Sequence, residues 1–385
     1  MTKQMSKKGQ RLFALLLAVA MMFSVMPMNA IAVTSTNVNE NGYIEVRTIE
    51  DLYNIRNDLT ANYILMDDID LTTATAQGGE WDFDGNGWNP IGSNDVYGAE
   101  AFTGIFDGNG RSIIGLRIDA TTVPSGTDTT VYVGLFARVD GVVKNLTVAG
   151  SISFANTAKD IYIGGLAGIS EGALFERCKS FVDVYAKSGS ADTSTAKYVY
   201  AGGIVGNVSN STINMCANSG KVETYVGGHT SKAYVSGIAG KVANSTISRS
   251  YNSGDIYSKS VAYQTFVGTL TGGYTKKEAA YSYVNGISYG GSVENSYNSG
   301  VISGEEIYST NTYSGITCSA ENISTSYNVG NVNSGAGKGV GSGTISNCYY
   351  LKGTGTTSTG ATVLTESQML TIAFTVPYNS NSRIS

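Results

Sequence analysis

The feature that most constrains this chain is a two-part motif that returns along most of its length. In the clearest copy, residues 234–240 form an aromatic, glycine-rich first half, and residues 244–254 form a second half that ends in Tyr-Asn-Ser-Gly. The first half returns at residues 162–168 and 200–206, and the second half at residues 213–220, 293–300, 323–330 and 345–349. A pattern that repeats every ~20 to 50 residues is typical of a solenoid, in which each unit buries its core against its neighbours.

The spacing of the copies indicates one coil of a solenoid per copy. Each second half contains one small residue, the anchor, at Cys178, Cys216, Ser250, Ser296, Ser326 and Cys348. The steps between anchors are 38, 34, 46, 30 and 22 residues, which suit a three-strand coil with loops of variable length. The Asn-x-Gly that follows most anchors is predicted to be a corner, because glycine takes a positive φ without steric cost and asparagine tolerates one.

The residue types in the copies favour a parallel β-helix over other repeat folds. The copies are rich in Gly, Ser, Thr, Asn and β-branched residues, which form helices poorly, and they lack a helical apolar period. A β-propeller blade needs four strands at a steadier spacing, whereas β-helix coils differ in length because insertions leave as loops. The sequence therefore predicts an all-β, right-handed, single-stranded parallel β-helix of about eight coils with a short N-terminal capping helix.

These copies resemble the GLUG-motif repeats of secreted and cell-surface bacterial proteins. The likeness lies in the strings G-L-A-G, G-I-V-G and G-I-A-G with their Tyr-Asn-x-Gly partners, and in the preceding run at residues 62–71, 88–92 and 102–110. It covers about residues 43–351. The resemblance implies a parallel β-helix on the outside of a cell. Because the motif is structural, the resemblance implies no catalytic residues.

The first 32 residues have the pattern of a secretory signal peptide. Four basic residues precede an apolar run over residues 12–23, and a small-x-small pattern ends at Ala32, near which we expect cleavage. The run is shorter than the ~20 apolar residues that span a bilayer, so no transmembrane segment is expected in the mature chain. Removing residues 1–32 leaves 21 basic against 30 acidic residues, a net charge of −9, which argues against nucleic acid as a partner.

Beyond the signal peptide, three further segments are predicted. Residues 33–60 hold a strand and a short amphipathic helix, marked by the capping sequence Thr48-x-x-Asp51, that covers the first coil. Residues 61–351 form the β-helix, and residues 352–385 are a closing strand or a truncated remnant of a further domain. No sorting sequence or apolar anchor ends the chain, so we expect either a released protein or an incomplete chain.

Residues 82–87 match the first half of a calcium-binding loop. Asp82, Asp84 and Asn86 have the spacing of the first ligands of an EF-hand-type loop. The twelfth position, where a bidentate glutamate belongs, is Ser93, and no flanking helix pair is predicted. Asp-Gly and Asn-Gly are also ordinary turn pairs. The sequence leaves a turn and a calcium site open as interpretations, and it predicts no other cofactor.

Catalytic motifs are sparse. The single histidine, His229, excludes a zincin motif, and a Ser-His-Asp triad would have to use it. The strings at residues 168–172 and 286–290 match the nucleophile elbow, but neither precedes a predicted helix. The densest acidic group lies at residues 67–70, and the repeats offer no carboxyl pair at matched positions for glycoside cleavage. The sequence therefore favours a non-catalytic chain.

The four cysteines are predicted to be free thiols. Cys178, Cys216 and Cys348 hold the anchor position that is Ser elsewhere, and Cys318 lies outside it. Export of the chain would favour disulfides. In-register strands, however, place equivalent Cβ atoms about 4.8 Å apart and pointing the same way, whereas a disulfide prefers about 3.8 Å.

Tyr251, Tyr297 and Tyr327 precede the Asn-x-Gly in three copies, and we expect them to form a column along one edge of the β-helix. Two roles are open for this column. It is either a packing ladder or an outward surface that binds sugar rings. Lys179 and Ala217 hold the same position in earlier copies, and because lysine is seldom buried unpaired, that end of the column should face water.

These observations predict an exported cell-surface or extracellular structural or interaction module, adhesin-like and non-catalytic. Its partner would be an extracellular glycan, the cell wall or a host surface protein. One alternative is a carbohydrate-active β-helix enzyme, a polysaccharide lyase or hydrolase, which follows from fold analogy alone. Another is the non-catalytic repeat region of a larger surface protein.

Overall fold

The computed structural model describes residues 38–92, 100–120, 130–156, 160–189, 196–267, 274–332 and 337–375, and for residues 263–267, 274–278 and 372–375 it describes the backbone alone. The predicted signal peptide and Ser93 lie outside the described residues. The chain forms two compact units, Met1–Glu45 and Val46–Ser385. The described part of the first unit contains a turn in which the amide of Asn39 donates to the carbonyl of Tyr43, 2.9 Å away.

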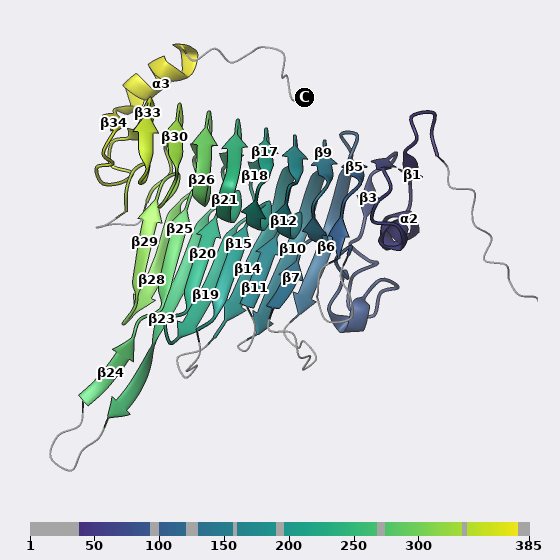
Figure 1. The fold of residues 1–385 in the computed structure, drawn as a ribbon, viewed down its shortest axis with the longest axis horizontal. Helices are drawn as coiled ribbons and strands as arrows, with labels where there is room; N and C mark the ends of the chain where they lie inside the picture. Colours follow the sequence, from purple (N-terminus) through teal and green to yellow (C-terminus); the bar gives the residue numbers. More distant parts are fainter. Residues whose placement is uncertain are drawn as a thin grey trace, which may run out of the picture. The chain divides into compact units, whose positions relative to one another are not determined.

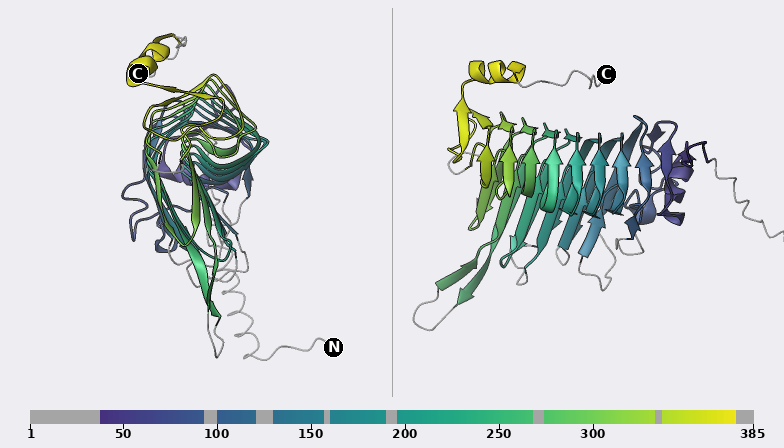
Figure 2. Two further views of the ribbon diagram at one scale, coloured as in Figure 1. Left: turned by 90° about the vertical axis from the view of Figure 1, so that its left-hand side faces the viewer. Right: turned by 45° about the horizontal axis from the view of Figure 1, so that its top comes forward.

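The second unit is a parallel β-helix, as predicted. Three sheets run along the stack of coils, and each complete coil contributes strands in the order sheet C, sheet A, sheet B (Figure 1). Figure 2 shows the same coils stacked in line, with strands of one sheet side by side. Because successive side chains of a strand point to opposite faces, the inward residues of all three sheets share one core.

Among the residues that the structure describes, the helical segments are α2 (Ile49–Asn54), η1 (Ile55–Asn57), η2 (Phe83–Gly85) and the longer α3 (Glu366–Thr375). β1 (Ile44–Val46) lies at the boundary of the two units. The strands of sheet C are β7 (Thr130–Val133), β11 (Asp160–Gly164), β15 (Tyr198–Gly202), β20 (Lys232–Ser236), β25 (Tyr281–Asn285) and β29 (Thr310–Ser314).

The strands of sheet A in the second unit are β2 (Tyr63–Leu65), β4 (Ala101–Phe102), β5 (Ile105–Asp107), β8 (Phe136–Val139), β9 (Val142–Lys144), β12 (Ala167–Glu171), β13 (Leu174–Glu176), β16 (Val205–Ser209), β17 (Thr212–Asn214), β21 (Ala239–Ser248), β26 (Ser288–Glu294), β30 (Asn322–Ser324) and β32 (Thr344–Ser346). The strands of sheet B are β3 (Ile69–Asp70), β6 (Ser112–Ala120), β10 (Thr147–Asn156), β14 (Lys179–Ser188), β18 (Ala217–Asn218), β19 (Val222–Gly228), β22 (Tyr251–Asn252), β23 (Ile256–Val267), β24 (Tyr274–Glu278), β27 (Tyr297–Asn298), β28 (Ile302–Ile307), β31 (Tyr327–Asn328), β33 (Cys348–Leu351) and β34 (Ala361–Leu364).

Coil length varies at one corner, the connection from sheet B to sheet C. Two residues join β28 to β29, whereas nine join β14 to β15. Between β23 and β25 the chain adds β24, which pairs antiparallel with the extended end of β23. This two-stranded arm projects from the coils at the lower left of Figure 1. The unequal steps between anchors therefore arise mainly at this corner.

The predicted N-terminal helix is present as α2. Thr48 and Asp51 form the expected capping box, with the side chain of each accepting from the backbone amide of the other. Leu52 and Ile55 are completely buried, so the helix turns its apolar side toward the core. Within residues 352–385, expected to be a closing strand or a truncated remnant of a further domain, residues 361–364 form the strand β34 and residues 366–375 form the helix α3.

The Asn-x-Gly sequences form bends, but the expected reason for them is wrong. None of their glycines has a positive φ, and a positive φ of 48–55° occurs instead just before each anchor, at Arg177, Met215, Arg249, Asn295, Thr325 and Asn347. A Cβ on Gly254 would lie 2.0 Å from the carbonyl oxygen of Gly220, and Gly300 and Gly330 repeat this contact with the coil before them. These glycines are needed because the backbones of successive coils approach too closely for a side chain.

The asparagines of these sequences form a buried ladder, defined by Asn218, Asn252, Asn298 and Asn328. The side-chain amide of each of the first three donates to Oδ1 of the next over 2.8 Å. Each amide in the ladder also donates to the carbonyl of the glycine two residues later, at 2.7–3.0 Å. All four side chains are 0% exposed. Because buried polar groups must be satisfied, the ladder holds the coils in one register.

The two halves of the motif occur together because they pack against each other across the coil. A Cβ on Gly237, in the first half, would come within 2.2 Å of the Asn252 side chain in the second. The same relation joins the remaining pairs, Gly203 with Asn218, Gly286 with Asn298 and Gly315 with Asn328. The glycine of one half thus leaves the space that the ladder asparagine of the other half fills.

The anchors form a second buried ladder. The backbone amide of Cys216 donates to Oγ of Ser250, and the next two anchors repeat this bond, at 3.1–3.2 Å. The four cysteines are free, as predicted, and Cys178, Cys216 and Cys348 are buried. Burial raises the pKa of the Cys178 thiol well above its ordinary value, which disfavours the reactive thiolate.

We predict that Asn252→Ala lowers the free energy of unfolding by about 2–4 kcal/mol, because the Asn218 amide loses one of its two acceptors and Oδ1 of Asn298 loses its donor. Urea unfolding followed by circular dichroism measures the change. Asn322→Ala, at an exposed position in β30, is the matched control and should shift stability by no more than about 0.5 kcal/mol. Equal losses in the two variants would contradict the role of the ladder.

Candidate functional site

The predicted tyrosine column is present on the outer face of sheet B. Tyr251, Tyr297 and Tyr327 pair in register, and Ala217 and Lys179 hold the preceding positions, as expected. The ring centroids of successive tyrosines are 5.0 Å apart, and their planes differ by 4–5°. Tyr327, at the end of the stack, is 36% exposed. Both faces of the Tyr297 ring are therefore covered by neighbouring rings, which leaves its edge toward solvent.

A second tyrosine column, not anticipated from the sequence, runs along sheet C. Three of its members, Tyr162, Tyr200 and Tyr234, begin the three copies of the first half. Tyr132 and Tyr283 hold the equivalent positions on the coils at either end, and neighbouring ring centroids are 4.4–5.2 Å apart. Lys241 lies beside this column, with its Nζ 5.4 Å from the centre of the Tyr234 ring. Burial raises the pKa of Tyr234 to about 12. The tyrosine that begins each copy of the first half could have predicted this column from the sequence.

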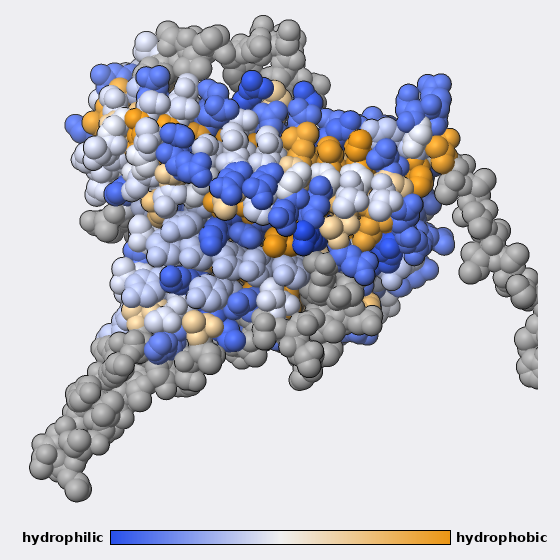
Figure 3. All heavy atoms as spheres, in the orientation of Figure 1, coloured by the Kyte–Doolittle hydropathy of each residue, from blue (hydrophilic) through white to orange (hydrophobic). Residues whose placement is uncertain are grey.

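A shallow hollow of about 260 Å³ lies on the outer face of sheet B, across β10, β14 and β19. The inward-facing Ile152 and Val184 contribute its floor, and both side chains are buried in the core. Its rim is polar and is formed by the outward side chains of three successive coils, Ser151, Ser153, Asp183, Tyr185, Lys221 and Glu223. We call this feature the sheet B hollow. Figure 3 shows hydrophilic residues over most of the face that it views, with apolar residues in separate patches.

The hollow exists because side-chain size changes from coil to coil. Ser151 and Ser153 on β10 lie opposite Asp183 and Tyr185 on β14, and Tyr185 lies opposite Glu223 on β19. The two serines are short, so the surface drops at β10 between larger neighbours. Tyr185 and Glu223 are far apart in sequence, and only the register of the coils brings them together.

Charges around the hollow are paired. Nζ of Lys221 lies 2.5 Å from Oε2 of Glu223, and the backbone amide of Lys221 donates to Oδ1 of Asp183 over 2.8 Å. Burial raises the pKa of Tyr185, and the nearby Glu223 and Tyr225 raise it further. The Tyr185 phenol therefore stays neutral and can both donate and accept a hydrogen bond. Carboxylate, ammonium, hydroxyl and phenol groups thus surround one depression.

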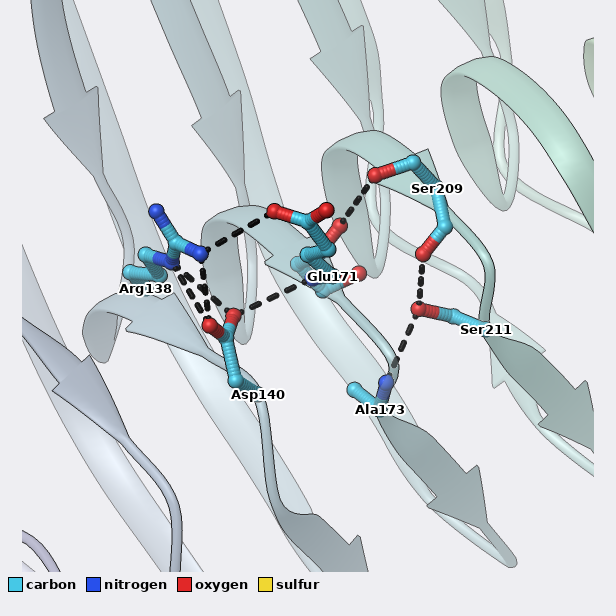
Figure 4. Close-up of polar contacts among 7 residues, drawn as sticks. Arg138, Asp140, Glu171, Ala173, Ser209 and Ser211 are labelled. Atoms are coloured by element: carbon cyan, nitrogen blue, oxygen red, sulfur yellow. Dashed lines mark hydrogen bonds and ion pairs between the residues drawn. The ribbon is translucent and has the colours of Figure 1, made fainter.

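A second polar cluster lies at the edge of sheet A, near the ends of β8 and β12 (Figure 4). The guanidinium of Arg138 binds the Asp140 carboxylate through Nε and Nη2, at 2.6–2.9 Å, and also reaches Glu171 at 3.2 Å. The amide of Glu171 donates to Asp140 over 3.1 Å. Nearby, Oγ of Ser211 accepts from the amide of Ala173 over 2.9 Å. These groups form hydrogen bonds and ion pairs with one another, which indicates that the cluster stabilises the contact between successive coils.

The candidate calcium loop contains η2. Oδ2 of Asp82 accepts from the amide of Gly78 and Oδ1 from the amide of Gly87, each at 2.7 Å. The bond from Gly78 is the main reason that the pKa of Asp82 is lowered. Asp84 is exposed and Asn86 is buried. Among the described residues, no three His, Cys, Asp or Glu side chains are grouped so that they could hold a metal.

The residues considered for a serine triad lie in strands or turns. Ser170 is in β12 and Ser288 is in β26, and both are buried. Neither strand leads into a helix, so the local structure of a nucleophile elbow is missing at these two serines. His229 lies after β19, with Nδ1 3.2 Å from Oγ1 of Thr230.

Comparison with known proteins gives a partial match in sequence. No family model matches this chain. Over 147 residues it is 39% identical to halomucin of Haloquadratum walsbyi, a match that covers 37% of this chain. It covers 1% of halomucin, so this chain spans a very small part of the length of that relative.

Among solved structures, the chain is similar to a candidate immunoglobulin A1 protease from Bacteroides ovatus. The sequences are 16% identical, the TM-score is 0.43, and the match covers 88% of this chain and 89% of the other. In the part of the chain that the structure describes, no helix is both long enough and apolar enough to cross a membrane.

We predict that Tyr297→Ala destabilises the protein more than Tyr251→Ala or Tyr327→Ala. Tyr297 stacks on both Tyr251 and Tyr327, whereas Tyr251 and Tyr327 do not stack on each other, and an aromatic pair contributes about 0.5–1.5 kcal/mol beyond its buried area. Urea unfolding measures the order, and Tyr297→Phe, which keeps the ring, is the control. Unchanged stability in all three alanine variants, with lost retention on a glycan or cell-wall matrix, would make this column a binding surface instead.

The calcium interpretation has a direct test in thermal unfolding. If Asp82, Asp84 and Asn86 bind calcium, adding the ion raises the melting temperature, because a ligand that binds only the folded state stabilises it. Asp84→Ala should remove this increase, while Asp119→Ala, at another half-exposed carboxylate, should keep it. Identical melting curves in calcium and in chelator would leave an ordinary turn.

Proposed function

We propose that this chain is an exported, non-catalytic module that acts at the cell surface or outside the cell and binds glycans through the outer face of sheet B. The observation that carries the proposal is the sheet B hollow. A neutral phenol, two hydroxyls, two carboxylates and an ammonium group converge there on one depression. Polyhydroxylated ligands are bound by such a combination of an aromatic surface and a few placed polar groups.

Three observations support an extracellular location. The first 32 residues have the pattern of a signal peptide, and the copies of the motif resemble GLUG repeats. The similarity to halomucin agrees with a role at the cell surface. Because the chain corresponds to a very small part of halomucin, it is also compatible with a repeat region of a larger surface protein.

A carbohydrate-active enzyme is the second candidate, and one observation favours it. Asp183 and Glu223 place two carboxylates at the same hollow, and a pair of carboxyl groups is what most glycoside hydrolases require. Against this role, Glu223 is paired with Lys221, and Asp183 accepts a backbone hydrogen bond. Each of the two carboxylates is thus already held by a partner within the protein.

A glycan panel separates these functions. The mature protein is incubated with soluble and insoluble glycans, and both retention and chain cleavage are scored. We expect retention without cleavage, and we expect Tyr185→Ala to reduce retention by about tenfold. Tyr308→Ala, at a 59% exposed tyrosine outside the hollow, is the matched control.

Cleavage that disappears in Asp183→Asn or Glu223→Gln would establish the enzyme and overturn the non-catalytic proposal. Absence of both retention and cleavage on all glycans would overturn glycan binding altogether. Binding that is equal in Tyr185→Ala and Tyr308→Ala would move the binding surface away from the hollow.

A further inference from the structure

We infer that the sheet B hollow binds a neutral, linear oligosaccharide that lies across the coils, parallel to the axis of the β-helix. This ligand class rests on the glycan-binding function proposed above and extends it to the charge, length and direction of the glycan. Four features of the hollow lead to it: its side walls, its extent, the uncovered side of Tyr185, and its charge.

The side walls leave the hollow open in one direction. Phe181 stands two residues before Asp183 on β14, faces the same way, and is 50% exposed. Two residues beyond Tyr185, Lys187 lies opposite Tyr225, and its Nζ is 5.0 Å from the centre of that ring. These side chains limit the hollow along the strands. Across the coils its floor runs from Ile152 on β10 to Val184 on β14, and its rim continues to Lys221 and Glu223 on the third coil, so a ligand that reaches the whole rim lies in that direction.

The extent of the hollow sets a minimum ligand length. Its rim comes from three successive coils. Neighbouring strands lie about 4.8 Å apart, so two steps span roughly 10 Å, which is about the length of a disaccharide. A single sugar would contact only part of the rim. A ligand of two or three sugars would reach side chains of all three coils.

Tyr185 offers a ring surface that the tyrosine columns do not. On the coil before it, the position opposite is Ser153, whose side chain is too short to cover a phenol ring. Among the described residues, no other aromatic ring stacks on Tyr185, in contrast to the rings of Tyr251 and Tyr297. A sugar placed over Ser153 would rest its C–H face against Tyr185 and direct hydroxyls to Asp183.

The charge around the hollow selects a neutral ligand. Lys221 is paired with Glu223, and beyond the serines Arg117 lies 3.7 Å from Asp119 and 3.4 Å from Asp82. Lys221 and Arg117 are thus already matched by carboxylates, Nζ of Lys187 lies over the Tyr225 ring, and Asp183 adds a further negative charge. An acidic polysaccharide would be repelled by this surface, whereas sugar hydroxyls can donate to its carboxylates.

Binding measured against ligand length tests the inference. The neutral glycan that the panel retains best is cut to lengths of one to five sugars, and each is titrated into the mature chain by calorimetry. We expect affinity to rise by about tenfold or more from one sugar to three and then to level off. Ser153→Tyr, which fills the hollow, should lower the affinity for the trisaccharide by about tenfold or more, while Asn322→Tyr, at an exposed position of sheet A outside the hollow, leaves it unchanged. Circular dichroism confirms that both variants fold.

The outcomes separate this inference from the proposed function. Affinity that does not depend on length, or that survives Ser153→Tyr in a folded protein, would overturn the inference and leave glycan binding intact. Retention of acidic glycans alone would do the same. If the panel retains no glycan, the inference and the proposed function are both wrong.

Discussion

Close contact between the backbones of successive coils is the constraint on which this structure depends. At Gly254, Gly300 and Gly330 a single added carbon would lie 2.0 Å from a carbonyl oxygen of the coil before. That proximity lets the asparagine amides reach one another at 2.8 Å and leaves them fully buried. A coil that moved by one residue would lose the glycine contact and the amide bond together. The register of the outer surface follows from these inner contacts.

Much of the fold could be predicted because each copy of the repeated motif corresponds to one coil. The recurring motif, its uneven spacing and its lack of a helical period were enough to predict stacked β-coils, and Thr48 with Asp51 marked the N-terminal helix correctly. The error concerned Asn-x-Gly. The same three letters are typical of a positive-φ turn and of a close backbone approach beside a buried amide. Sequence alone does not distinguish these two causes, because each requires the same residues.

The sheet B hollow was harder to predict than the fold. It depends on outward residues that do not repeat, such as Ser153, Tyr185 and Glu223, and on which of them become neighbours. Because the coils differ in length, the sequence does not show which outward residues lie next to one another. The Tyr251 column was predictable because its members belong to the motif itself, yet its stacked rings cover one another. Motif residues therefore mark the packing of the coils, and residues between the motif copies form the hollow.

The corner between sheet B and sheet C has a consequence for how such a chain evolves. Differences in coil length gather there, from the two residues between β28 and β29 to the added arm of β23 and β24. The asparagine ladder and the motif glycines lie elsewhere on each coil. Insertions at this corner can therefore diversify the outline of the molecule without altering its inner register. The same separation makes the corner a suitable place to graft foreign loops onto the scaffold.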